Sequence, residues 1–129
     1  MAFTVQRWPD SEVLVVTGHG AGSLEESDHV LDELARQRLV PVIRAVLFDL
    51  RQLEWIPNPE EARLIAARYG TFGARHGCRM AYLAPPGAQY GVARMIEMLS
   101  QQYGVRAATF ATLEAAHAWL LHEVRAMGA

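Results

Sequence analysis

Short hydrophobic runs near the start of the chain predict a pair of neighbouring strands. Residues 3–8 alternate apolar and polar side chains, which indicates a strand with one face in solvent. Residues 12–17 are apolar in the middle on both faces, as expected for a more deeply buried strand. The residues between them, Pro9–Ser11, are typical of a tight turn. We therefore predict an antiparallel hairpin.

Capping residues predict where the first two helices begin. Ser23 is followed three positions later by Glu26, a capping box that opens a helix. Pro41 is expected to end this region, because proline disrupts a helix interior. The run Asn58–Glu61 combines a cap, a proline at the first helical position and a glutamate at the capping-box position. Gly77 is the expected end of this second helix.

The rest of the pattern completes an α/β domain. Gly70 and Gly73 weaken the last turns of the second helix. The other predicted elements are strands over residues 45–50, 79–84 and 105–110, a helix over 88–103 and a last helix capped by Thr112. The order β-β-α-β-α-β-α-β-α predicts a mixed, mostly parallel sheet with helices packed on it. We expect residues 1–129 to form one domain.

Composition excludes several functional classes. The chain has 129 residues, of which 51% are hydrophobic and 20% charged, as in one globular domain. The formal net charge of -2 provides no basic field, so nucleic-acid binding is not expected. The start of the chain does not resemble a signal peptide, and no apolar run is long enough to span a membrane. A cytoplasmic location is expected.

Three segments resemble a known group of bacterial proteins. These segments are Val46–Arg51, Tyr90–Glu97 and Phe110–Leu120. Together with the element order, they resemble the STAS-like (SpoIIAA-like) domains, which include anti-sigma-factor antagonists and many small relatives. The resemblance covers nearly the whole chain. It implies a STAS-like fold and a regulatory module that binds a partner without catalysing a reaction.

The chain departs from the anti-sigma antagonists at their regulatory turn. In that family an Asp-Ser-Ser-Gly turn opens a helix, and phosphorylation of one hydroxyl releases the partner. The corresponding positions here are Pro57–Glu60, where neither serine position carries a hydroxyl. Phosphorylation needs such an oxygen, so the resemblance implies a module without this switch. Asn58 is expected to cap a helix whose first N–H groups could still face a partner.

The best candidate site is the edge of the sheet where the parallel strands end. Ligands of open α/β sheets bind at this edge, next to helix N-termini. The expected helix start at Gly87 should lie there beside that at Asn58. Tyr90 and Arg94, one helical turn apart, could hold an anionic group; alternatively, Arg94 pairs with Glu97. The candidate ligand- or partner-binding residues are Arg51, Trp55, Asn58, Tyr90 and Arg94.

Other chemistries lack the residues they need. The loop Gly18–Ser23 has neither the lysine of a phosphate-binding loop nor the glycine spacing of a dinucleotide site. The five histidines are not spaced as metal ligands, and Cys78 is expected to be a small buried residue. No serine lies in a nucleophile elbow. We predict no catalytic residue, no cofactor and no metal.

The identity of the ligand stays open at this point. The alternatives are a protein partner, a small anionic ligand and a lipid-like ligand, the last because STAS domains share their general architecture with the CRAL-TRIO lipid-binding fold. An enzyme using the cleft near Tyr90 and Arg94 is a further alternative, with His19 or Glu54 as its base. A homodimer is also considered, because the strand over 3–8 is short and is expected to expose apolar side chains.

Overall fold

One mixed sheet lies at the centre of the fold. The computed structural model describes residues 2–9, 11–37 and 42–128. Its strands are β1 (Phe3–Arg7), β2 (Val13–Gly20), β3 (Ala45–Leu53), β4 (Arg79–Leu83) and β5 (Ala107–Phe110). They lie side by side in this order, with β1 antiparallel to β2 and all other neighbours parallel. The described helices are α1 (Leu24–Gln37), α2 (Pro59–His76), α3 (Ala88–Ser100), the 3₁₀ turn η1 (Gln101–Tyr103) and α4 (Leu113–Ala126).

The predicted order of elements is confirmed, whereas several predicted ends differ. β2 and β3 each run three residues further than expected, because they stay paired through an irregularity after Thr17 and up to Gly20 and Leu53. The last residues of the third predicted helix form η1 instead. The predicted turn residue Asp10 and the predicted break at Pro41 lie outside the described residues.

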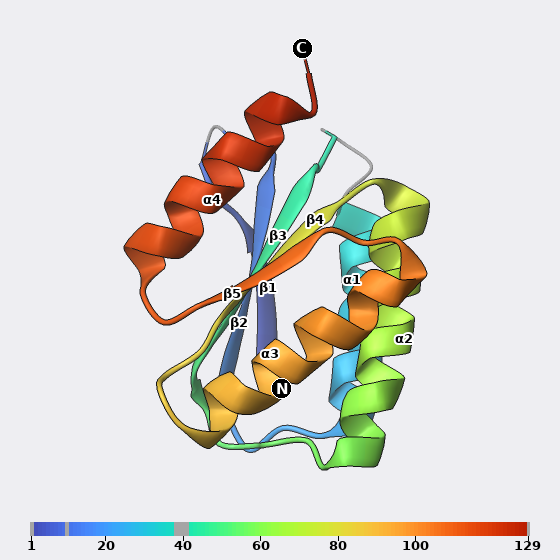
Figure 1. Ribbon diagram of the computed structural model, residues 1–129, viewed down its shortest axis with the longest axis vertical. Coiled ribbons are helices and arrows are strands. Elements are labelled where there is room, and N and C mark those ends of the chain that lie inside the picture. Colours follow the sequence, from blue (N-terminus) through green and yellow to red (C-terminus); the bar gives the residue numbers. More distant parts are fainter. Residues whose placement is uncertain (1, 10, 38–41, 129) are drawn as a thin grey trace.

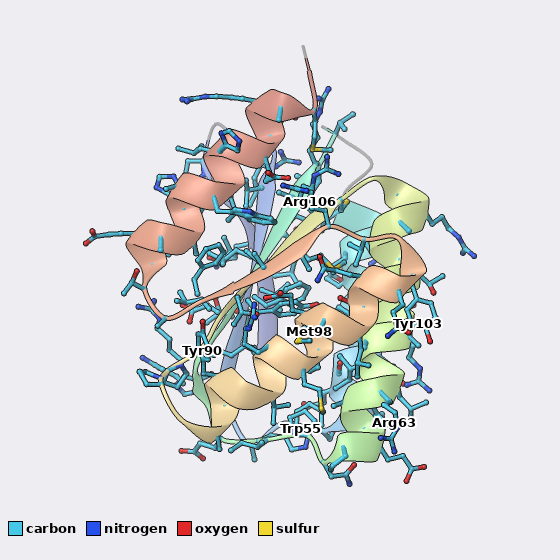
Figure 2. All side chains as sticks on the ribbon, in the orientation of Figure 1. Trp55, Arg63, Tyr90, Met98, Tyr103 and Arg106 are labelled. Carbon is cyan, nitrogen blue, oxygen red and sulfur yellow. The ribbon has the colours of Figure 1, made fainter. Side chains whose placement is uncertain are left out.

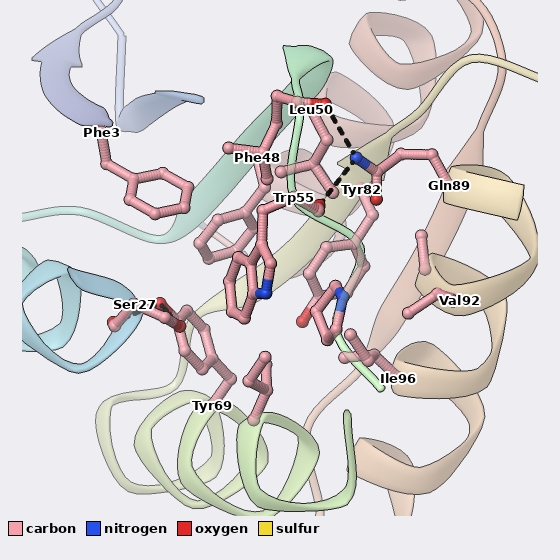
Figure 3. Close-up of a pocket in the computed structure, with 14 residues that line it drawn as sticks. Phe3, Ser27, Phe48, Leu50, Trp55, Tyr69, Tyr82, Gln89, Val92 and Ile96 are labelled. Carbon is pink, nitrogen blue, oxygen red and sulfur yellow. Dashed lines mark hydrogen bonds between the residues drawn. The ribbon is translucent and has the colours of Figure 1, made fainter. Parts of the chain in front are cut away.

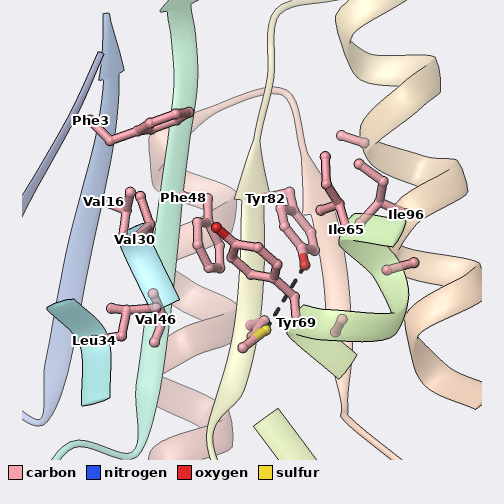
Figure 4. Close-up of a cluster of buried hydrophobic side chains, with 14 of the residues drawn as sticks. Phe3, Val16, Val30, Leu34, Val46, Phe48, Ile65, Tyr69, Tyr82 and Ile96 are labelled. Carbon is pink, nitrogen blue, oxygen red and sulfur yellow. Dashed lines mark hydrogen bonds between the residues drawn. The ribbon is translucent and has the colours of Figure 1, made fainter. Parts of the chain in front are cut away.

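Helices cover both faces of the sheet (Figure 1). Helices α1, α2 and α3 pack on one face, where side chains such as Phe48 form the larger core. Helix α4 packs on the other face through Ala116 and Leu120. Since successive residues of a strand point to opposite faces, β3 supplies both cores. In the larger core the ring of Phe48 stacks on that of Tyr82, with centroids 5.1 Å apart (Figure 4).

Strand β1 forms one edge of the sheet, but it does not expose apolar side chains. Phe3 is only 8% exposed and packs in the larger core, and Val5 packs against the same core. The side chain of Gln37 donates a hydrogen bond of 3.3 Å to the outward carbonyl of Val5. The prediction of exposed apolar residues on this strand is therefore wrong, because α1 covers them. The homodimer stays a prediction.

The two capping boxes differ in how they close. At α2 both bonds form: the N–H of Glu61 donates to Oδ1 of Asn58 at 2.8 Å, and the N–H of Asn58 donates to Oε1 of Glu61 at 3.0 Å. At α1 the N–H of Glu26 donates to Oγ of Ser23, but the Glu26 carboxylate accepts from the N–H of Ala2. Glu26 therefore ties the start of the chain to α1.

Candidate binding pocket

Helices α2 and α3 begin at the same end of the sheet, where the parallel strands finish (Figure 1). Gln89, which lies in the first turn of α3 and is 7% exposed, links this end of α3 to the segment that leads into α2. Its amide nitrogen donates to the carbonyls of Leu53 and Trp55, both at 3.2 Å. These bonds fasten the start of α3 to the loop between β3 and α2. The two helix starts thus lie at the same end of the sheet, on either side of this loop.

A small apolar pocket lies beneath this loop. Its cavity volume is about 50 Å³. The walls come from strands β1, β3 and β4, the loop after β3, and helices α1, α2 and α3 (Figure 3). The described lining residues are Phe3, Ser27, Phe48, Leu50, Leu53, Trp55, Pro57, Ile65, Tyr69, Tyr82, Gln89, Val92, Ala93 and Ile96. None of these residues carries an acidic or basic side chain.

The hydroxyl groups in the pocket wall are bonded within the protein. Tyr69 donates to the backbone carbonyl of Ser27 at 2.7 Å, and the two hydroxyls are 3.0 Å apart. The Tyr82 hydroxyl faces the sulfur of Met80 at 3.9 Å. Burial raises the pKa of Tyr69 and of Tyr82 far above the ordinary value for tyrosine. Both hydroxyls therefore stay protonated at neutral pH.

Of the five candidate residues, Trp55 lines the pocket. Asn58 follows the pocket residue Pro57 and caps α2. Figure 2 shows Trp55 at the end of the molecule where α2 begins, with Arg106 towards the opposite end. The first turn of α2 also carries Glu60 and Glu61, so negative charge already occupies this helix start.

The other three candidates lie outside the pocket lining. The Arg51 guanidinium binds the Asp49 carboxylate through two bonds of 2.9 and 3.0 Å. Burial opposes ionisation of Asp49, but the hydrogen bonds from Arg51 outweigh it and lower the Asp49 pKa. Arg94 binds both carboxylate oxygens of Glu97, at 3.0 and 2.9 Å. This is the alternative pairing considered for Arg94. Tyr90 packs against the larger core.

Two solved structures resemble this arrangement over nearly its whole length. One is an uncharacterised protein of the DUF3478 family with a SpoIIAA-like fold, from Shewanella loihica PV-4. It matches with a TM-score of 0.59 and 17% identity over 92% of each chain. The other is a serine-to-glutamate variant of RsbS from Moorella thermoacetica, with a TM-score of 0.64 and 15% identity over 97% of this chain and 99% of that one. No known family profile matches the sequence, and no curated protein does.

The chain has a SpoIIAA-like fold. The prediction of a STAS-like, mixed α/β architecture is thereby confirmed. At these identities the likeness concerns the fold alone. The activity must therefore be argued from this chain's own residues.

Within this SpoIIAA-like fold, we expect Asn58→Ala to lower the free energy of unfolding by about 1 kcal/mol, because it removes the side-chain acceptor for the N–H of Glu61. The control is Asn58→Asp, which keeps an acceptor and should be close to wild type. Urea unfolding monitored by circular dichroism would measure both variants. An equal loss of stability in both variants would contradict the prediction, because Asn58→Asp keeps the acceptor that Asn58→Ala removes.

Other chemistry-bearing residues are not brought into the pocket. His19 and Glu54, the bases considered for an enzyme, line a separate hollow beside Arg51. Cys78 is buried, with its sulfur 3.7 Å from the carbonyl of Ile43. Among the described residues no group of three or more His, Cys, Asp or Glu could hold a metal ion. No described helix is long and apolar enough to cross a membrane.

Gln89 is the important pocket residue that the sequence did not reveal. A glutamine in the first turn of a helix has the pattern of a solvent-exposed residue. Its burial follows from two acceptors more than thirty positions earlier in the chain. The sequence indicated only that Phe48 and Tyr82, which form the aromatic wall, are buried, since both belong to strands predicted as buried. Nothing in those strands indicated a hollow next to them.

Proposed function

We propose that this protein is a non-enzymatic, cytoplasmic binding module, and that its pocket receives an aliphatic side chain from a protein partner. The observation that carries the proposal is the small apolar pocket at the carboxyl edge of the sheet, lined by Trp55 and by Gln89, which bonds to the Trp55 carbonyl. Pockets at this edge commonly bind the ligands of open α/β folds. Anti-sigma antagonists, which share the fold, bind protein partners.

The size of the cavity supports a side chain over a whole small molecule. Drug-sized ligands occupy pockets of roughly 300–1,000 Å³, and an apolar cavity that binds benzene has a volume of about 150 Å³. The 50 Å³ available here fits a short aliphatic group. An exposed apolar residue, Ile56 (47% exposed), lies between the pocket residues Trp55 and Pro57. It offers further contact area to a partner whose side chain enters the pocket.

The charges around the pocket support this proposal over the anionic and enzymatic alternatives. Arg51 and Arg94 each already bind a carboxylate of this chain, which offsets the positive charge that would attract an anionic ligand. General acid–base catalysis needs a group that titrates near the working pH within reach of the substrate. The described pocket wall provides none, since its tyrosines are protonated and its other polar groups are amide, hydroxyl and indole.

We further propose that phosphorylation of the loop between β3 and α2 does not regulate this module. Residues 54–61 contain no serine, threonine or tyrosine. The position at the helix start is held by Asn58, whose side chain is engaged in the capping box. We expect the same dissociation constant for the partner before and after phosphatase treatment of the protein. A change in affinity on treatment would contradict this part of the proposal.

The test of the binding proposal uses variants that fill the pocket. Val92→Phe replaces an aliphatic side chain of α3 by a larger aromatic ring that fills the pocket. Val92→Met fills it with a flexible, unbranched side chain that is smaller than phenylalanine. The matched control is Met98→Phe, on the same helix at a position 60% exposed and outside the lining. Proteins that copurify with wild type, each Val92 variant and the control are compared by quantitative mass spectrometry. Each candidate partner is then purified and titrated by calorimetry.

We expect a partner that binds wild type and Met98→Phe equally, and each folded Val92 variant at least about tenfold more weakly, as for loss of an anchoring contact. Thermal unfolding of each variant confirms that it is folded. Equal binding of the partner to the Val92 variants would overturn the proposal. So would the absence of any protein that binds wild type in purified form.

A further inference from the structure

Trp55 has an unused hydrogen-bond donor that faces the pocket. Its indole ring is half-buried in the pocket wall. Figure 3 shows the ring nitrogen turned towards the inside of the pocket, on the side of Tyr82. Within the part of the chain that the structure describes, no protein group accepts from this N–H, and because it is not among the buried unpaired atoms, solvent reaches it. Tryptophan N–H groups usually have a partner when they are buried, so covering the pocket would leave this donor in need of one.

The other side-chain donors of the pocket are already engaged. The Tyr69 hydroxyl donates to the Ser27 carbonyl, and the hydroxyls of Tyr69 and Ser27 are hydrogen-bonded to each other. The Gln89 amide nitrogen donates to two backbone carbonyls. Tyr82 faces a buried sulfur. An occupant that offers a hydrogen-bond acceptor would therefore meet the Trp55 N–H in an otherwise apolar surrounding.

We propose that Trp55 is the specificity-determining residue of the pocket and donates its indole N–H to a backbone carbonyl of the partner, next to the aliphatic side chain that enters the cavity. This inference rests on the proposed function and adds the chemistry of the occupant. In the indole of Trp55 the ring packs against the side chain and the N–H binds the carbonyl, so one residue recognises both parts. Such a donor in an apolar pocket discriminates against occupants that lack an acceptor.

The distance between the apolar group and the acceptor favours a polypeptide as the occupant. In a peptide the carbonyl carbon is only two bonds from Cβ of the side chain. In a fatty acyl chain the carbonyl lies at the far end from the tip that a cavity of about 50 Å³ could take. A lipid could therefore fill the pocket without reaching Trp55, whereas a leucine or valine residue could do both.

The test separates the apolar group from the carbonyl by using three probes on the full chain. N-acetyl-leucinamide offers an aliphatic side chain and carbonyls, N-acetyl-alaninamide offers the carbonyls with only a methyl group, and xenon offers an apolar atom alone. The readouts are the ¹⁵N–¹H signals of the three indoles and the methyl signals of Val92 and Ile96. The variants are Trp55→Phe and the control Trp119→Phe, whose ring packs against Phe110 under α4.

We expect N-acetyl-leucinamide to shift the Trp55 indole signal and both methyl signals, xenon to shift the methyl signals, and N-acetyl-alaninamide to cause little change. Trp55→Phe should weaken N-acetyl-leucinamide binding about three- to tenfold, the loss expected for one hydrogen bond, while xenon, which has no acceptor, should still shift the Val92 and Ile96 methyl signals. Trp119→Phe should behave as wild type.

The outcomes distinguish this inference from the proposed function. If xenon and N-acetyl-leucinamide enter the pocket but the Trp55 indole signal does not move and Trp55→Phe binds equally well, the hydrogen bond is overturned and the pocket stands. If N-acetyl-alaninamide shifts the indole as strongly as N-acetyl-leucinamide, the coupling of carbonyl and side chain is overturned. If no probe shifts the Val92 and Ile96 methyl signals, both proposals fail together.

Discussion

Gly73→Ala is expected to lower the free energy of unfolding by about 2 kcal/mol, although alanine is the better helix former. A Cβ atom at this position of α2 would lie 2.3 Å from Cγ2 of Val105 and 3.3 Å from the carbonyl oxygen of Cys78. Val105 is 4% exposed, and its branched side chain has few allowed rotamers, so it cannot simply turn away. Overpacking of this kind costs about 1–3 kcal/mol and outweighs the helix-propensity gain of at most about 1 kcal/mol.

The matched control for this prediction is Gly91→Ala in α3. A Cβ atom at Gly91 would meet no heavy atom within 4 Å, so the helix-propensity gain should appear alone. We expect this variant to be more stable than wild type by about 0.5–1 kcal/mol. Urea unfolding of both variants measures the two opposite signs. A stability gain in both would show that Val105 yields easily and that α2 is not closely packed there.

The tertiary contacts of Gly73 and the nearby Gly70 could not be predicted from the sequence. Both were identifiable only as residues that weaken a helix. In the structure Gly70 lets α2 approach the end of α3, because a Cβ atom there would lie 2.7 Å from the carbonyl oxygen of Ser100. Residues so far apart in the chain are neighbours only after folding. A local pattern therefore reports the propensity of these glycines and not their contacts.

The elements were predictable because their signals are local. The capping run at Asn58, the cap at Thr112 and the buried strand centred on Leu47 all depend on residues within a few positions of one another. Strand ends were less predictable, since the last residues of β2 and β3 are held by pairing with each other. The cover over Phe3 and Val5 was missed for a similar reason, because α1 supplies it from elsewhere in the chain.

The edge of the sheet that the sequence indicated is the one where the apolar pocket lies, but a binding site there stays a prediction. Carboxylates two and three positions away bind Arg51 and Arg94. For Arg94 the sequence offered this pairing as the alternative to binding an anion, whereas it gave no such indication for Arg51. Trp55 could be found because a large aromatic residue in a loop is unusual unless it packs against something. The pocket that Trp55 lines is formed by residues from three helices, so no single segment of the sequence could predict it.

A second large effect is expected at Glu123, on the opposite face of the sheet. Its carboxylate is almost fully buried and binds Nε of Arg79 at 3.1 Å and Nε of Arg106 more closely. Glu123→Gln removes the charge and keeps the shape. We expect a loss of about 2 kcal/mol at pH 7, within the range for hydrogen bonds to charged groups. The loss stays below that of a fully buried pair, because Arg79 is only half-buried and Arg106 is exposed, so water can solvate them.

The same ion pairs predict how stability depends on pH. Burial opposes ionisation of Glu123, but the hydrogen bonds and charges of Arg106 and then Arg79 outweigh it, so its pKa lies below the ordinary value of 4.5. The unfolded chain therefore takes up this proton at a higher pH than the folded chain. The contribution of Glu123 to the free energy of unfolding is complete above about pH 5 and is lost as the pH falls through the folded pKa.

Urea unfolding from pH 7 to pH 3 should thus show a shallower acid-side decline in stability for Glu123→Gln than for wild type. Glu54→Gln, at an exposed loop carboxylate, should follow wild type; a decline in Glu123→Gln as steep as in wild type would contradict the assignment.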